Sequence, residues 1–109
     1  MKEIIIAFDV DGTIYGSPLA SKSTPRVNLP VIMLIQLLSE MKNTKIIAWS
    51  GGGKDYCEQI IIKFGLDKYI ERCYGKQTYD ETIDGKVDIA FDDEHLFSLA
   101  DKNIIVRTK

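Results

Sequence analysis

The sequence is poor in cysteine and has no long apolar run. Its two cysteines, Cys57 and Cys73, lie inside predicted elements and match no metal-ligand spacing. We interpret them as reduced thiols in the core of a cytosolic protein. No apolar segment approaches the ~20 residues that cross a bilayer, and the chain begins with a predicted strand rather than a signal peptide. A cytoplasmic protein with no membrane partner is therefore expected.

An excess of positive charge is also missing. Fourteen Lys and Arg residues face sixteen Asp and Glu residues, so the net charge is −2. This balance argues against an extended nucleic-acid-binding surface, and nucleic acid is expected only as a substrate. No internal repeat or low-complexity tract is present. A length of 109 residues with 45% hydrophobic residues predicts one globular domain, residues 1–109.

The most informative stretch is the apolar run at residues 4–8, which is followed by the letters DVDGT. Such a run predicts a strand buried in a parallel sheet. Unpaired carboxylates are costly to bury, so Asp9 and Asp11 should lie at the carboxyl end of this strand, where open α/β sheets bind ligands. Residues two apart on a strand point the same way, so both carboxylates can face one site. Gly12 permits a sharp exit, and Thr13 adds a hydroxyl beside the acids.

A second strand, predicted at Lys45–Trp49, also stops at a polar break, SGGG. Helices are predicted on either side of it, at Leu29–Lys42 and Lys54–Phe64. The first has too many apolar positions for a narrow stripe, which indicates that it is largely covered, and the aromatic and aliphatic stripe of the second is interpreted as core. A glycine run before a helix exposes backbone N–H groups that suit a phosphate, and Gly51 begins this run.

The C-terminal half repeats the pattern of a strand that ends in polar groups. A short extended segment and two strands are predicted there: Tyr69–Tyr74, Val87–Phe91 and Asn103–Val106. Lys76 follows the first of these, and Asp92 and Asp93 follow the second. Because parallel strands end at one edge of a sheet, these groups are expected to meet Asp9 at a shared ligand-binding edge.

The DVDGT block resembles the first motif of the haloacid dehalogenase superfamily of phosphohydrolases. Ser50 falls where that superfamily has its second motif, a hydroxyl residue at the end of the second strand. Asp92 and Asp93 resemble its fourth motif, an acidic pair at the end of a later strand. The resemblance covers the whole chain. It implies a three-layer, Rossmann-like α/β sandwich with a parallel five-stranded sheet, in which the second and fourth strands flank the first.

The resemblance also bears on how the site is closed. In the superfamily, a flap or a whole cap domain follows the first strand. The fourteen residues from Tyr15 to Asn28 are too few for a cap domain. A cap-less enzyme is therefore expected, with a site that is open or closed by a partner subunit.

The superfamily's third motif is a lysine that neutralises the nucleophile and the phosphate, and two lysines compete for this role. Lys76 follows the third predicted strand and should lie at the same carboxyl edge as the acids. Lys86 precedes the fourth strand. Five strand residues at ~3.3 Å each place Lys86 roughly 16 Å from Asp92. We favour Lys76, and Lys86 is the alternative.

The resemblance implies a phosphatase that works through an aspartyl-phosphate. Asp9 attacks phosphorus. Asp11 protonates the leaving oxygen and then activates water. Asp9, Asp92 and the backbone carbonyl of Asp11 hold Mg²⁺, with Asp93 as a further candidate ligand.

On the phosphate side, the resemblance implies that Ser50 and Lys76 hold the equatorial oxygens, while Gly12 and Thr13 shape the loop. Three residues outside the motifs are weaker candidates. Lys22 and Arg26 are interpreted as solvated loop charges, and His95 as a capping or exposed residue of a predicted helix at Glu94–Ala100.

Other functions remain open at this stage. Within catalysis, the phosphoryl group can pass to an acceptor other than water. A phospho-receiver or regulatory module also gathers carboxylates, a hydroxyl and a lysine at a sheet edge, although its acidic pair ends the first strand and its phosphorylated Asp ends a later one. An inactive scaffold is a third alternative. The partner expected is a phosphorylated substrate of unknown size, and association with a second copy of the chain is left open.

Overall fold

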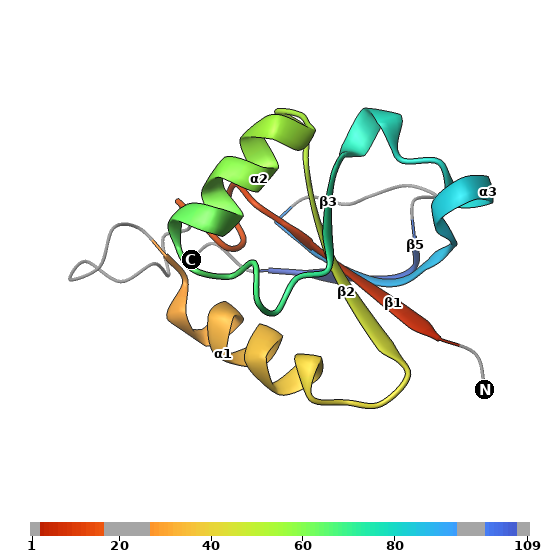
Figure 1. The fold of residues 1–109 in the computed structure, drawn as a ribbon, viewed down its shortest axis with the longest axis horizontal. Coiled ribbons are helices and arrows are strands. Elements are labelled where there is room, and N and C mark those ends of the chain that lie inside the picture. The colour runs from red at the N-terminus through yellow and green to blue at the C-terminus, as the bar shows by residue number, and fades with distance from the viewer. Residues whose placement is uncertain (1–2, 17–26, 94–99, 107–109) are drawn as a thin grey trace.

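A sheet of five parallel strands organises the structure, a computed structural model that describes residues 3–16, 27–93 and 100–106. The elements are β1 (Ile4–Asp9), α1 (Leu29–Ser39), β2 (Thr44–Ser50), α2 (Lys54–Lys63), β3 (Arg72–Gly75), the 3₁₀ helix η1 (Lys76–Thr78), α3 (Glu81–Asp84), β4 (Val87–Asp92) and β5 (Ala100–Ile105). The strand order is β3-β2-β1-β4-β5, and all pairs are parallel (Figure 1). The predicted α/β class with a parallel five-stranded sheet is confirmed.

β1 lies at the centre of the sheet, between β2 and β4, as predicted. Phe8 is paired with Ala48 of β2 on one side and with Phe91 of β4 on the other. The rings of Phe8 and Phe91 stack with their centroids 4.6 Å apart. This register brings the next residues, Asp9 and Asp92, to the same level at the carboxyl edge.

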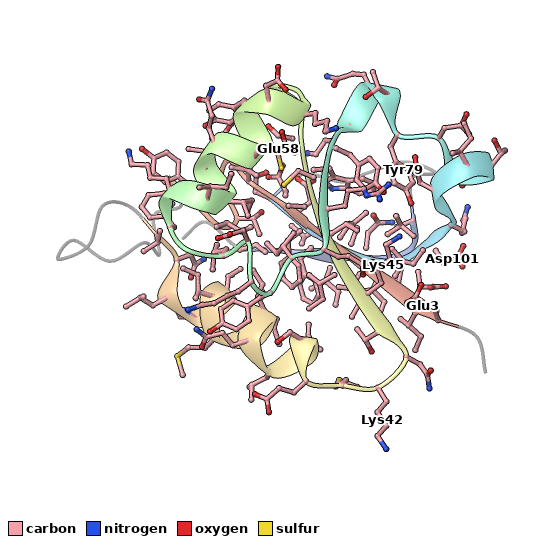
Figure 2. The ribbon with its side chains drawn as sticks, in the orientation of Figure 1. Glu3, Lys42, Lys45, Glu58, Tyr79 and Asp101 are labelled. Carbon is pink, nitrogen blue, oxygen red and sulfur yellow. The ribbon has the colours of Figure 1, made fainter. Side chains whose placement is uncertain are left out.

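The two faces of the sheet carry separate core clusters. On one face, Phe8 and Ile6 pack with Ile35 of α1 and Ile61 of α2. On the other face, Trp49 is fully buried, and its ring makes an edge contact with Tyr79. Figure 2 shows Tyr79 pointing inward from the segment that links β3 to β4. The four-residue α3 buries none of its side chains, so this second covering layer is thin in the described part of the chain.

α1 begins and ends with clear local signals. The side chain of Asn28 accepts a hydrogen bond from the Val31 N–H, and a proline occupies the first turn, which is a favoured start for a helix. The helix ends at Ser39 rather than at Lys42, and Asn43 has a φ of 58° in the turn that follows.

The expectation that the first helix is largely covered is wrong. Leu29, Met33, Leu37 and Met41 retain 45%, 61%, 65% and 55% of their exposure. One face of α1 packs on the sheet, and among the described residues nothing covers the opposite face.

Two other boundaries differ from the prediction. The segment predicted to extend from Tyr69 begins as a turn, because the N–H groups of Tyr69 and Ile70 both bond to the carbonyl of Leu66. β5 begins at Ala100, which was predicted to end a helix; the rest of that predicted helix, including His95, lies outside the described residues. No described helix combines the length and the apolar character needed to cross a membrane.

Candidate active site

The predicted site residues meet at the carboxyl edge of the sheet. A cleft of about 350 Å³ opens there, lined by Asp9, Asp11, Gly12, Gly51, Gly52, Lys76 and Asp93. These residues end or follow β1, β2, β3 and β4, four neighbouring strands of the sheet. Placing binding groups at such an edge is the usual arrangement in open α/β proteins.

Asp9, Lys76 and Asp92 form an ion-pair triad at this edge of the sheet. The Lys76 ammonium lies 2.8 Å from Asp9 Oδ1 and 2.7 Å from Asp92 Oδ2. Asp9 and Asp92 are 3% and 1% exposed, whereas the Lys76 side chain is 17% exposed. Lys76 reaches both acids because β3 ends at Gly75, directly beside the end of β2, and η1 then turns the chain over the edge.

The triad perturbs the pKa values of its members. Burial raises the pKa of Asp9 to about 7, with a further rise from the Asp92 charge, while Lys76 opposes both effects. Burial acts to lower the pKa of Lys76, but its hydrogen bonds and charge attraction to Asp9 and Asp92 outweigh this and raise it. One ammonium therefore faces two carboxylates, with the Asp93 carboxylate close by, and the edge is short of positive charge.

Carboxylate oxygens of Asp9, Asp92 and Asp93 all lie within 4.8 Å of one another. Mg²⁺ binds oxygen at ~2.0–2.1 Å, so opposite ligands in its octahedron are about 4 Å apart. Three carboxylates gathered this closely supply the hard oxygen donors that suit Mg²⁺. The residues present therefore fit a magnesium ion. The Asp11 carboxylate does not belong to this cluster, which leaves only the backbone carbonyl of Asp11 as a predicted ligand from that residue.

The loop after β1 is tightly wound around this cluster. The N–H groups of Thr13, Ile14 and Tyr15 all bond to the carbonyl of Val10. Gly12 has a φ of 86°, and a Cβ at this position would lie 2.2 Å from Asp93 Oδ2. Only glycine fits here. Thr13 is fully buried, and its hydroxyl donates to Asp9 Oδ2 at 3.4 Å, so it holds the second oxygen of that carboxylate.

The loop after β2 forms the other wall of the cleft. Ser50 is 1% exposed, and its Oγ accepts a hydrogen bond of 3.0 Å from the Gly52 N–H. Gly51 is exposed and lines the cleft. The Gln77 amide donates to the Gly51 carbonyl at 3.1 Å, which ties this loop to η1. Gln77 was not singled out from the sequence.

Asp11 lies in a different environment from Asp9. It is exposed, and Tyr56 of α2 donates a hydrogen bond of 2.6 Å to its Oδ1. This bond, together with burial and the charge of Asp11, raises the pKa of Tyr56 to about 12. Tyr56 was interpreted as part of a core stripe, but the structure brings its hydroxyl to the site. Its place in the first turn of a helix that starts at the carboxyl edge was the signal available in the sequence.

The remaining candidates lie elsewhere. Lys86 is at the start of β4, where it pairs with Glu81 at 3.4 Å and with Asp101 at 3.7 Å. The structure therefore places Lys76, and not Lys86, with the acids. Lys22, Arg26 and His95 are outside the described residues.

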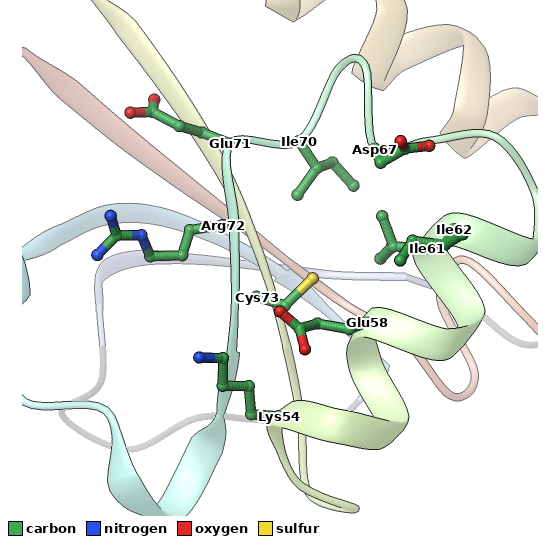
Figure 3. Close-up of a pocket in the computed structure, with 9 residues that line it drawn as sticks. All are labelled: Lys54, Glu58, Ile61, Ile62, Asp67, Ile70, Glu71, Arg72 and Cys73. Carbon is green, nitrogen blue, oxygen red and sulfur yellow. The ribbon is translucent and has the colours of Figure 1, made fainter.

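A larger hollow of about 460 Å³ contains none of the predicted site residues. It lies between α2 and the segment 67–73, with charged side chains of both signs around Ile61 and Ile70 (Figure 3). Cys73 lines it, while Cys57 lies in the core behind; both thiols are free and buried. The mixed charges favour no single class of ligand.

Comparisons of the chain with models of protein families, with curated proteins and with solved structures find no match. The resemblance to haloacid dehalogenases therefore rests on the sequence motifs alone.

Proposed function

We propose that this chain is a Mg²⁺-dependent phosphomonoester hydrolase of the haloacid dehalogenase type, without a cap domain. The observation that carries the proposal is the triad of Asp9, Lys76 and Asp92 at the carboxyl edge, with Asp11 two residues beyond Asp9 on the same cleft. Three separate stretches of chain supply these groups, and they are the groups that the phosphatase chemistry requires.

In the first step, an Asp9 oxygen attacks phosphorus while the ester P–O bond breaks, and Asp11 gives a proton to the leaving oxygen. Lys76 and Thr13 hold the two oxygens of Asp9, which fixes the orientation of the nucleophile. The phosphoryl oxygens gain negative charge, and the Lys76 ammonium, which lines the cleft beside Asp9, is placed to stabilise it.

In the second step, water attacks phosphorus, Asp11 takes its proton, and the bond between Asp9 and phosphorus breaks. The two aspartates suit these roles because their surroundings differ. Asp9 is buried and held by Lys76 and Thr13, whereas Asp11 is exposed. Two carboxylates in contrasting environments are a usual basis for dividing nucleophilic and acid–base work.

Asp9 and Asp92, with Asp93 beside them, would hold the magnesium ion. When bound, Mg²⁺ would neutralise the carboxylates and a phosphoryl oxygen. This accounts for a cluster that Lys76 alone leaves with excess negative charge.

The sheet order weighs against a phospho-receiver. Receiver domains of the flavodoxin-like type have the strand order 2-1-3-4-5, whereas this chain has the order 3-2-1-4-5. A receiver also does not need a proton donor two residues after the phosphorylated aspartate. In this chain Asp11 occupies that position relative to Asp9.

The proposal is tested with p-nitrophenyl phosphate and Mg²⁺. We expect many turnovers per chain, with release of inorganic phosphate. A single phosphorylation event without turnover would indicate a receiver. Transfer of the phosphoryl group to an added alcohol in preference to water would indicate a phosphotransferase, and no reaction with any phosphomonoester would indicate an inactive scaffold.

Removal of Mg²⁺ is expected to abolish turnover, and Mg²⁺ binding itself should depend on pH. The pKa of Asp9 is about 7 without the ion, so binding must displace a proton below that pH. We expect the affinity for Mg²⁺, measured by calorimetry, to rise between pH 6 and pH 8, with proton release in the lower part of this range. Undiminished turnover in EDTA would contradict the proposed metal site.

Replacing Tyr56 with phenylalanine is expected to lower kcat about tenfold and to leave KM nearly unchanged. The hydroxyl of Tyr56 orients Asp11 through a 2.6 Å hydrogen bond, and the proton donor acts in the transition state rather than in substrate binding. Tyr69→Phe, which alters a tyrosine hydroxyl that accepts from Gln36, is the matched control. Equal effects of the two variants on kcat would indicate that Tyr56 has no positioning role.

A further inference from the structure

The outer face of α1 carries a continuous apolar stripe. Leu29, Met33, Leu37 and Met41 are 45%, 61%, 65% and 55% exposed. Leu29, Met33 and Leu37 are spaced four residues apart, so they lie on one side of the helix, and the exposed Met41 follows two residues after the helix ends at Ser39. Figure 1 shows α1 at the periphery of the molecule, with no described element beyond it. We call these four residues the α1 stripe.

The α1 stripe offers a partner no charge and little hydrogen bonding. No charged residue occurs between Leu29 and Ser39. The two polar side chains of α1 form hydrogen bonds within the chain: Gln36 donates to the Tyr69 hydroxyl at 3.4 Å, and Ser39 donates to the carbonyl of Gln36 at 2.7 Å. A partner of this face must therefore itself present an apolar surface.

The size of the stripe matches the centre of a protein–protein interface. Each of its four side chains exposes roughly 100 Å², so together they present about 400 Å² of apolar surface. A standard interface buries ~800 Å² per partner, with an apolar centre and a polar rim. The half-buried Ile32, Leu34 and Leu38 lie along the same helix and extend the apolar area. The largest apolar patch on a monomeric domain is typically about this size, and such patches are often functional.

We propose that the α1 stripe is the centre of a two-fold interface between two copies of this chain, with their α1 helices antiparallel. In that arrangement Met33 of each copy meets Leu37 of the other, and Leu29 meets Met41. Helices that pack nearly aligned, with a crossing angle of about 20°, stay in contact over a stretch of this length, and an interface related by a two-fold axis requires such a self-complementary surface.

The charges at the ends of α1 favour the antiparallel arrangement. The first turn of α1 has no acidic residue, and Glu40 caps the opposite end, with Lys42 beyond it. Figure 2 shows Lys42 pointing away from the body of the molecule. Antiparallel pairing brings Glu40 and Lys42 of one copy together to the helix N-terminus of the other, where their opposite charges offset each other, and it keeps the like charges of the two copies apart. A parallel pair would instead place the two Glu40 side chains near each other.

The test measures the molar mass of the full chain over a range of concentrations by sedimentation equilibrium. We expect a dimer that dissociates on dilution. The double variant Met33→Glu/Leu37→Glu should raise the dissociation constant at least ~100-fold. Ile62→Glu and Ile83→Glu, at apolar positions that are 64% and 78% exposed on α2 and α3, are the matched controls and should leave the dimer intact.

A charge-swap variant tests the identity of the occupant and the orientation. Met33→Lys/Leu37→Glu removes the same apolar groups as the double glutamate variant. In an antiparallel self-dimer it places Lys against Glu at both contacts. Its dissociation constant should therefore be at least ~10-fold lower than that of the double glutamate variant. Circular dichroism checks that each variant is folded. A wild-type chain that stays monomeric at every concentration would overturn the proposal, as would equal masses for the two double variants.

Discussion

Asp9→Asn is expected to lower kcat at least ~1,000-fold and, at the same time, to stabilise the metal-free protein. The loss of activity follows from removing the nucleophile of the proposed reaction, because an amide oxygen does not form the aspartyl-phosphate. The gain in stability follows from the charges at the sheet edge. Asp9 is 3% exposed and lies beside Asp92, so a neutral side chain relieves both burial of charge and repulsion between like charges.

The gain in stability should depend on pH in a defined direction. The pKa of Asp9 is raised from 3.8 to about 7 in the folded chain. Between these values the folded state holds a proton that the unfolded state has lost, so ionisation of Asp9 lowers the free energy of unfolding as the pH rises. The Tm of the variant should therefore exceed that of the wild type by about 5 °C at pH 8 and by less at pH 5.

Asp67→Asn is the control for this prediction, because Asp67 is an exposed aspartate outside the site. It should change neither kcat nor Tm appreciably. An Asp9→Asn variant that keeps wild-type turnover would contradict the role of Asp9. A variant that is inactive but less stable than the wild type would instead contradict the account of repulsion at the sheet edge.

The placement of Asp9, Asp92 and Lys76 could be predicted because it depends on strand ends. An apolar run fixes where a buried strand lies, and a carboxylate directly after it must leave the core. Parallel strands then bring these ends to one edge without further information. The same argument separated Lys76 from Lys86, since the two lysines lie at opposite ends of their strands.

Tyr56 shows where this kind of reasoning fails. Its helical phase is shared with Ile60 and other core residues, and the ring is indeed half-buried. The hydroxyl, however, extends past the core to Asp11. A periodicity in the sequence assigns the whole side chain to one environment, whereas a tyrosine can bury its ring and present its polar end to a site.

The prediction that α1 is largely covered was wrong for a different reason. Its apolar content was visible in the sequence and suggested a covered helix, but the number of apolar residues does not determine how many faces the fold covers. A helix that packs on one side of a sheet buries only one of its faces, as Val31 and Ile35 do here, and leaves Met33 and Leu37 exposed. The apolar residues of α1 that the sheet does not bury are those we propose to bind a second copy. The sequence alone does not distinguish apolar residues buried within the chain from apolar residues buried in an interface.

Lys76→Met is expected to reduce both activity and stability, whereas Lys86→Met should affect neither. Without the ammonium, Asp9 and Asp92 are two buried carboxylates with no cation between them, a loss of about 3 kcal/mol in the metal-free protein. We expect kcat to fall about 100- to 1,000-fold, because the positive charge that faces the phosphoryl oxygens is also lost. Activity assays at saturating Mg²⁺, together with thermal melts with and without Mg²⁺, separate the two effects.

Mg²⁺ should restore much of the stability of Lys76→Met but little of its activity. A bound cation compensates the carboxylates that Lys76 otherwise neutralises, whereas it does not replace the hydrogen bonds of the ammonium to Asp9 and substrate. Lys86 is 42% exposed and pairs with exposed acids at 3.4 and 3.7 Å, so its replacement should alter stability by less than ~0.5 kcal/mol. If Lys86→Met were the inactive variant and Lys76→Met kept full turnover, the catalytic edge would have been assigned to the wrong end of the sheet.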